Sequence, residues 1–344
     1  MKVIIQIPCF NEAETLPLVL SELPRSLPGV DEIEVLVIDD GSSDGTAEVA
    51  RAHGVDHVVS YPTNRGLAHA FTTGLDAALA AGAAIVVNTD AANQYPGSAI
   101  HLLVAPILAG NAEIVLGERP IETIGDFSPI KKRLQRIGSN AVRKLSGTDI
   151  RDAPTGFRAI SREAALRMKV FGRFSYTLET IIQAGWEGTT IASVDIPTNP
   201  ATRPSRLARS MPSYIWRSTT TMVRSFALYK PFRFFVMLGT PLIAFGVALV
   251  LRWLAIHTFT EDTASRVPGL VAAAVFLLLG AQLWILAFVA DLLAANRRLL
   301  LELRLHRRRR DFAEPHIVLS ENDGRSRAAN AAPPEDDAAR KSAQ

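Results

Sequence analysis

The chain has 344 residues, a length that predicts about two folding units. Lys and Arg together number 37 against 34 acidic residues, and the net charge of +3 is too small to indicate a nucleic-acid-binding protein. The single cysteine, Cys9, excludes an internal disulfide and a zinc site of several cysteines, and with them a secreted disulfide scaffold.

The first 200 residues or so alternate short runs rich in β-branched residues with stretches of helical periodicity. Strands are expected at residues 3–7, 34–38, 57–60, 84–88 and 113–116, and helices at residues 12–23, 45–53, 68–81 and 97–108. Such alternation predicts an α/β fold with a mostly parallel sheet and helices on both faces. Because ligands bind at the carboxyl ends of such strands, the loops after Ile7, Ile38 and Asn88 are expected to carry the chemistry.

The first two of these loops are rich in acidic and amide side chains. They read Pro8-Cys9-Phe10-Asn11-Glu12 and Asp39-Asp40-Gly41-Ser42-Ser43-Asp44-Gly45-Thr46. Neither contains G-x-G-x-x-G, so a dinucleotide fold of the phosphate-cradling kind is not indicated. Carboxylates at strand ends can instead hydrogen-bond ribose hydroxyls and base edges. Two plainer interpretations stay open, namely Asp44 as a helix cap and Asp39-Asp40 as turn residues.

Together with Asn64-Arg65-Gly66 and the run from Asn88 to Pro96, these motifs resemble in order and spacing those of the family 2 glycosyltransferases with the GT-A fold. Residues 152–158, 177–180 and 203–207 resemble, more narrowly, the dolichyl- and polyprenyl-phosphate hexose synthases, and the likeness reaches to about residue 295. It implies an inverting, metal-dependent hexosyltransferase. Such an enzyme moves a sugar from a UDP- or GDP-linked donor to a polyprenyl phosphate for cell-envelope glycosylation.

The resemblance also implies partners and site residues. The expected cofactor is Mg²⁺ or Mn²⁺, and the expected partners are a nucleotide sugar, an undecaprenyl- or dolichyl-type phosphate and membrane lipid; no nucleic acid is expected, and a homo-oligomer is left open. Asp90, Glu179 and Arg158 are expected to be catalytic, and Asp90 and Gln94 to bind the metal. The expected donor-binding residues are Pro8, Phe10, Asn11, Glu12, Val37, Asp39, Asp40, Gly66, Asp90, Ala91, Ala92 and Arg119.

One position departs from the family pattern. The usual metal motif is D-x-D, whereas here Asp90-Ala91-Ala92 has alanine in place of the second carboxylate. Alanine offers no oxygen ligand, so metal affinity is expected to fall. Three interpretations stay open: Asp90, Gln94, the diphosphate and water hold the metal, or the chain is an inactivated variant, or Asn93 compensates.

An acceptor phosphate is already ionised at neutral pH, so it needs cations to hold it more than it needs a general base. Two basic clusters are candidates, and for each single residue a solvated charge is an equally simple interpretation. The expected acceptor-phosphate residues are Lys132, Arg133, Arg136 and Ser139 inside the catalytic domain and Arg203 and Arg206 near the membrane.

The C-terminal part of the chain holds two long uncharged segments, which explain a mean hydropathy of +0.16 in a chain with 21% charged residues. Residues 234–251 and 267–290 carry no charge, and both segments approach or exceed the roughly 20 residues that cross a bilayer. Buried helices of a large soluble core are the alternative. Seven basic residues and no acid lie in residues 203–233, and seven arginines lie in residues 297–310. The positive-inside rule therefore predicts a multi-pass protein of the cell membrane with both termini cytoplasmic.

The predicted organisation is a cytoplasmic GT-A domain (1–205), amphipathic basic juxtamembrane helices (206–232), a first transmembrane helix (233–256), an external loop (257–266), a second transmembrane helix (267–291) and a basic, then disordered, cytoplasmic tail (292–344). The juxtamembrane stretch suits a helix on an anionic bilayer, or a solvated basic face packed on the domain.

Two other functions stay open. A processive polysaccharide synthase shares the fold, but its Q-x-x-R-W motif is absent, since Trp216-Arg217 stands in the reverse order. A non-catalytic protein that binds a nucleotide sugar or a lipid phosphate is the second alternative, and Ala92 is its motivation.

Overall fold

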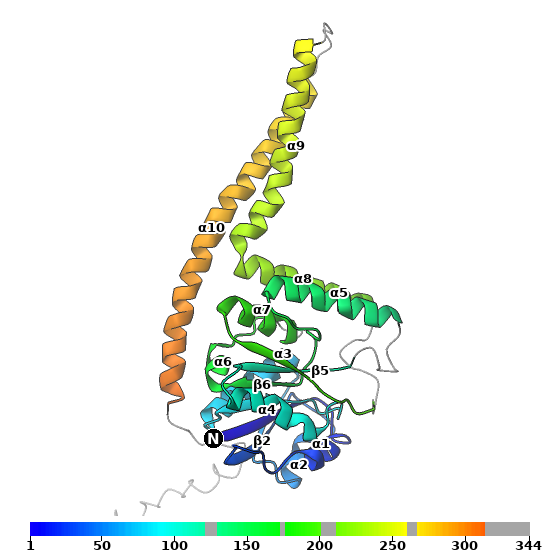
Figure 1. The fold of residues 1–344 in the computed structure, drawn as a ribbon, viewed down its shortest axis with the longest axis vertical. Helices are drawn as coiled ribbons and strands as arrows, with labels where there is room; N and C mark the ends of the chain where they lie inside the picture. Colours follow the sequence, from blue (N-terminus) through cyan, green and yellow to red (C-terminus); the bar gives the residue numbers. More distant parts are fainter. Residues whose placement is uncertain (121–128, 173–175, 201–210, 260–266, 314–344) are drawn as a thin grey trace, which may run out of the picture.

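The computed structural model describes residues 1–120, 129–172, 176–200, 211–259 and 267–313 (Figure 1). Its N-terminal part is built on a seven-stranded sheet with the order β3-β2-β1-β4-β6-β5-β7, in which β6 alone runs against its neighbours. The strands are β1 (Lys2–Cys9), β2 (Glu32–Asp39), β3 (His57–Ser60), β4 (Ile85–Asn88), β5 (Ile114–Glu118), β6 (Arg158–Ser161) and β7 (Ile191–Asp195). The predicted α/β fold with a mostly parallel sheet is confirmed.

Helices cover both faces of this sheet because the strands are apolar on both sides. Along β1, for example, Ile4 packs into one core while Val3 and Ile5 pack into the other, as the two-residue period of a strand requires. The helices are α1 (Leu16–Glu22), α2 (Thr46–Ala52), α3 (Leu67–Ala80), the 3₁₀ turn η1 (Gly97–Ala99), α4 (Ile100–Leu108), α5 (Pro129–Ser146), α6 (Arg162–Arg167) and α7 (Thr177–Glu187).

Three long helices follow the sheet domain: α8 (Met211–Tyr229), α9 (Pro231–Phe259) and α10 (Val267–Asp311). Figure 1 shows α8 lying across the top of the domain, while α9 and α10 rise from it as a pair. Only 11% and 17% of the apolar windows of α9 and α10 are buried, so these helices are not the core of a soluble domain. They are long and apolar enough to cross a membrane.

Small residues bring α9 and α10 close together. A Cβ atom built on Gly239 would lie 3.0 Å from the carbonyl oxygen of Gly280, and one on Gly246 would lie 3.1 Å from that of Ala273. Small residues at membrane-helix contacts let two backbones approach and gain packing energy that a lipid tail does not supply. The two helices are therefore closely packed around Gly239, Gly246 and Gly280.

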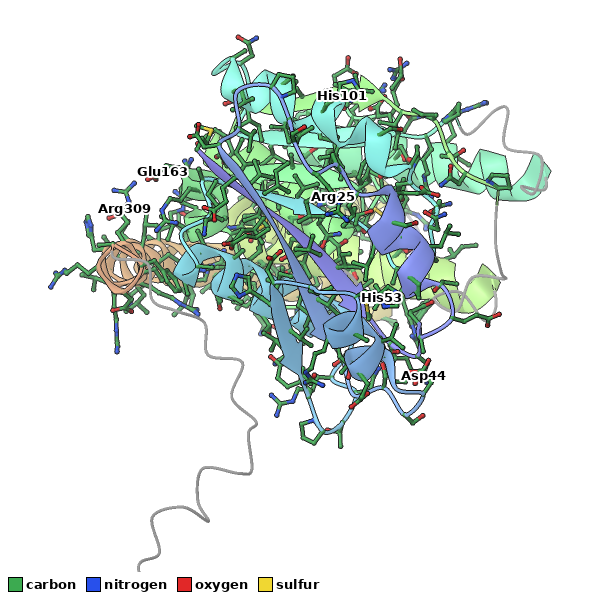
Figure 2. The ribbon with its side chains drawn as sticks, turned by 90° about the horizontal axis from the view of Figure 1, so that it is seen from below. Arg25, Asp44, His53, His101, Glu163 and Arg309 are labelled. Carbon is green, nitrogen blue, oxygen red and sulfur yellow. The ribbon has the colours of Figure 1, made fainter. Side chains whose placement is uncertain are left out.

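The helix α10 continues well past residue 291 and returns to the sheet domain. Arg308 donates to the carbonyl oxygen of Leu166 at 2.8 Å and pairs with the carboxylate of Asp76 on α3. Arg309 pairs with Glu163 on α6 at 2.7 Å, and Figure 2 shows the two side chains on the same side of the domain. The arginine-rich segment, predicted as the start of a tail, is thus helical and docked on α3 and α6 as far as Asp311. Residues 314–344 lie outside the described residues.

Candidate active site

The carboxyl ends of β1 and β2 are joined by hydrogen bonds between their loops. The Asn11 backbone N–H donates to Ser42 Oγ at 2.8 Å, and Asn11 Oδ1 accepts from the Ser43 N–H at 2.9 Å. The Glu12 N–H donates to Thr46 Oγ1 at 2.9 Å. Asn11 has φ of 55°, a left-handed conformation that Asn tolerates better than most side chains. The two predicted loops therefore form one connected edge.

Asp39 and Asp40 both lie buried at this edge. Asp40 accepts backbone N–H groups from Arg65 at 2.8 Å and Gly66 at 2.7 Å, so it holds the loop before α3. Asp39 accepts the N–H of Ser42 at 3.1 Å. Gly41 has φ of 74°, and a Cβ atom there would lie 2.5 Å from the Thr63 backbone, so the two loops touch where only glycine fits. Turn chemistry accounts for much of what these two carboxylates do.

Three neighbouring residues of the prediction lie in different surroundings. Asp44 accepts the N–H groups of Ala13 at 3.0 Å and Thr46 at 3.1 Å, so it links the first loop to the start of α2, but the N-cap residue of α2 is Gly45 and not Asp44. Val37 is fully buried in the core two residues before the strand end, and its donor-binding role stays a prediction. Phe10, by contrast, is exposed at this edge.

Asp90 lies in the loop after β4, where backbone groups hold its carboxylate. The N–H of Gln94 donates to Asp90 Oδ1 at 3.2 Å, and the N–H of Ala92 donates to the same carboxylate. Burial raises the pKa of Asp90 to about 6, with a smaller contribution from the charge of Glu12, while these N–H groups and Arg119 oppose the rise. The carboxylate thus lies where a further positive charge would be stabilising.

Arg119 and Asp152 form a buried pair beside this carboxylate. Arg119 donates from Nε to Asp152 Oδ2 at 2.7 Å and from Nη2 to Oδ1 at 3.0 Å, a two-pronged geometry that fixes the guanidinium. Its Nη1 lies 3.5 Å from Gln94 Oε1. The predicted residues Asp90, Gln94 and Arg119 are therefore brought together at the ends of β4 and β5.

Among the described residues, no group of three or more His, Cys, Asp or Glu side chains could hold a metal ion. Asp90 and Gln94 supply one carboxylate and one amide oxygen, a sparse set, yet Mg²⁺ is often held by one or two carboxylates together with substrate phosphates and water. The donor set thus fits a divalent ion that a diphosphate would share. Asn93 donates from Nδ2 to Glu22 at 3.1 Å, so this contact turns its amide nitrogen toward α1, and none of its described contacts is shared with Asp90.

Glu179 and Arg158 lie in the domain interior. Glu179 accepts the N–H groups of Phe171 at 2.9 Å and Gly172 at 2.8 Å. Arg158 is fully buried, donates to Thr180 Oγ1 at 2.7 Å and to the carbonyl of Thr155, and has a pKa lowered by burial. These contacts support the packing of α7 on the sheet, and catalytic roles for the two residues stay predictions.

The helix α5 reaches the same region through Ser139. This residue is buried, and its Oγ accepts the N–H of Ala153 at 3.3 Å, next to the Asp152 that holds Arg119. Arg136, one helical turn earlier, is exposed. The side chains of Lys132 and Arg133 and the whole of Arg203 and Arg206 lie outside the described residues.

Asp152 was missed as a site residue by the sequence prediction, which placed it only within a motif. The sequence shows only an acid in the run Asp152-Ala153-Pro154-Thr155-Gly156, and the pairing of the following strand with β4 and β5 is seen only in the structure. The antiparallel direction of β6 puts the residue before its start at the same edge as the carboxyl ends of its neighbours. The sequence prediction contained no β6, so this placement could not be foreseen.

Acidic, amide and guanidinium side chains thus gather at the strand ends of an α/β sheet, an arrangement that fits a GT-A-like fold. Residues 4–168 match the model of glycosyl transferase family 2. The dolichyl-phosphate hexose transferase of Haloferax volcanii is 30% identical over 193 residues, 55% of this chain and 78% of that protein. The chain therefore belongs to glycosyl transferase family 2.

Two further comparisons, one of sequence and one of structure, cover different shares of the chains. The polyprenol monophosphomannose synthase of Mycolicibacterium smegmatis is 30% identical over 47% of this chain, but the match spans only 62% of that protein. Among solved structures, glucosyl-3-phosphoglycerate synthase of Mycobacterium tuberculosis in complex with Mn²⁺ and UDP superposes with a TM-score of 0.51 at 22% identity, covering 66% of this chain and 79% of that one. This second likeness concerns the fold.

Proposed function

We propose that the protein transfers a hexose from a nucleoside diphosphate sugar to a polyprenyl phosphate at the cytoplasmic face of a membrane. The observation that carries the proposal is the contact between Ser139 on the basic helix α5 and Ala153, beside the Arg119–Asp152 pair. It joins a cationic helix to the expected donor site, just below two helices long enough to span a bilayer. Similarity to proteins named for transfer to dolichyl and polyprenol phosphates supports the same acceptor.

The chemistry follows from the charges involved. An oxygen of the acceptor phosphate forms a bond to the anomeric carbon as the bond to the donor diphosphate breaks on the opposite face. Arg119, fixed by Asp152, is placed to bind the diphosphate, and Asp90 and Gln94 are the residues that would hold a divalent ion beside it. Such an ion, when bound, stabilises the charge that develops on the leaving group. The arginines of α5 would hold the acceptor phosphate close to the donor.

An acceptor screen tests this proposal. The full chain in nanodiscs would be given radiolabelled UDP- and GDP-sugars with either undecaprenyl phosphate or 3-phosphoglycerate, a soluble phosphate acceptor. We expect transfer to the lipid and none to the soluble acid. Transfer to 3-phosphoglycerate alone would contradict the lipid acceptor, and nucleotide-sugar binding without transfer to either would favour the non-catalytic alternative.

Replacing Arg133 and Arg136 together by glutamine is expected to raise the KM for polyprenyl phosphate by about tenfold or more while changing nucleotide affinity little. Charge-assisted hydrogen bonds to phosphate contribute about 1.5–3 kcal/mol each, and neither arginine lies in a strand-end loop. The measurements are initial rates against acceptor concentration and nucleotide binding by calorimetry. Lys144→Gln, an exposed cation near the other end of α5, is the matched control. An unchanged KM would move the phosphate site to Arg203 and Arg206.

Cysteine labelling tests the proposed orientation in the membrane. We expect Ser265→Cys to react with an impermeant maleimide on intact cells and Ser342→Cys to react only after lysis, because basic flanks favour the cytoplasmic side. The native Cys9 is buried and gives a low background. Labelling of Ser342→Cys on intact cells would contradict the topology.

A further inference from the structure

The helix α10 carries a continuous exposed seam that its own chain leaves uncovered. In its first part, residues recur at alternating spacings of four and three: Val271, Val275, Leu278, Gln282, Ile285 and Val289. The same spacing continues through Leu292, Asn296, Leu299 and Leu303. The eight apolar members are 47–72% exposed. A strict seven-residue repeat of this kind is the pattern by which two helices wind around each other.

The opposite side of α10 faces its own chain with the same repeat. Ala273, Gly280 and Ala287 are buried against α9, and Arg308, three heptads after Ala287, contacts the sheet domain. In a heptad these positions lie opposite the seam. Figure 1 shows α10 along one side of the molecule, with α9 and the domain on its other side. The seam therefore points away from everything in the described chain.

Lipid tails do not account for the lower part of the seam. The Arg297 guanidinium lies 4.8 Å from the ring centre of Tyr229, the last residue of α8. Leu299 and Leu303 follow Arg297 along α10, with Leu303 about 9 Å further on at 1.5 Å per residue. On the proposed topology they lie on the cytoplasmic side of the bilayer surface, where an exposed leucine pair costs free energy unless a protein covers it.

Two amide residues on the seam point to the nature of the partner. Gln282 lies exposed in the apolar part of α10, where an amide facing lipid is unfavourable. Asn296 occupies the equivalent heptad position two repeats later. An identical helix would bring an amide opposite each amide, and one asparagine at such a position favours a parallel pair of helices in a fixed register.

Charged residues beside the seam match the same arrangement. In a parallel pair, Glu302 on one helix lies near the residue five positions later on the other, which is Arg307. Both side chains are exposed. Two copies in one membrane also share the same orientation, so their α10 helices can pair only in parallel.

We propose that α10 is the interface of a homodimer, in which two copies of the chain pair in parallel along the seam from Val271 to Leu303. The two-fold axis then runs along the membrane normal, and the two sheet domains lie on the outer sides of the pair. This inference concerns assembly; it rests on the proposed orientation of the chain in the membrane but not on the proposed reaction.

Disulfide cross-linking in membranes tests the interface. Leu292→Cys and Leu299→Cys each place a thiol opposite its own copy, so mild oxidation should link most of the chain into a dimer. Arg298→Cys, one residue away and off the seam, should give little. The native Cys9 is buried, and the unmodified chain is the blank. Equal cross-linking at 298 and 299 would overturn the proposal.

Charge reversal provides the second arm. Glu302→Arg or Arg307→Glu alone should weaken the dimer several-fold, as measured by photobleaching steps at low surface density, and the double exchange should restore it. A monomer at every density would refute the interface. If the chain dimerises only after residues 314–344 are removed, those residues would cover the seam in the intact chain. That result would also contradict the proposal.

Discussion

Asp90→Asn is expected to lower hexosyl transfer by about 10²–10³ or more, the cost of losing a group that stabilises charge at a leaving group. The substitution keeps the shape of the side chain and removes its negative charge. Because Asp90 is the only carboxylate in its loop, we expect Mn²⁺ affinity to fall with activity. Turnover against metal concentration and Mn²⁺ binding by electron paramagnetic resonance would be measured together.

Asp44→Asn is the matched control for this experiment. Asp44 lies at the same edge, but although burial opposes it, hydrogen bonds from Thr46 and from the Ala13 N–H lower the pKa of its carboxyl. For Asp90, by contrast, burial outweighs the N–H groups and Arg119 and raises the pKa of the carboxyl to about 6. We therefore expect Asp44→Asn to reduce thermal stability and leave Mn²⁺ affinity unchanged. Full activity in Asp90→Asn would show that the metal, if any, binds elsewhere.

The strand-end loops could be predicted because their signals are local. β-branched runs followed by Asp39-Asp40-Gly41 or Asn88-Thr89-Asp90 indicate strands and their carboxyl ends without any knowledge of distant contacts. The four-residue strand β6 gives a weaker signal, and its antiparallel pairing depends on β4 and β5 more than on its own residues. The position of Asp152 beside Arg119 follows from that pairing, so it could not be read from the chain.

Charged residues were harder to place than apolar ones. From the sequence, Arg158 was predicted to be catalytic, and Arg308 was predicted only as one of the arginines that flank the second membrane helix. The structure gives Arg158 partners inside the core and uses Arg308 to dock α10 on Leu166 and Asp76. An arginine's role depends on which carbonyl or carboxylate the fold brings within about 3 Å of it, and that distance is not encoded locally.

Ala92→Asp is expected to strengthen Mn²⁺ or Mg²⁺ binding and to raise turnover by as much as about 10²–10³, with little change in fold. Residue 92 lies two positions after Asp90, is only partly buried, and its backbone N–H already bonds to the Asp90 carboxylate. A carboxylate there would face the same diphosphate and add a second charged oxygen ligand to the sparse set of Asp90 and Gln94.

The comparison with Ala92→Asn separates charge from shape. Asparagine supplies an oxygen in nearly the same place without the negative charge, so we expect it to fall between the unmodified chain and Ala92→Asp in both metal affinity and turnover. If all three have the same activity and the same dependence on metal concentration, position 92 is not a ligand. The enzyme would then hold its metal through Asp90, Gln94 and the donor diphosphate. In that case Gln94→Ala should abolish the dependence of activity on metal concentration that Ala92→Asp failed to change. This substitution leaves Arg119 paired with Asp152.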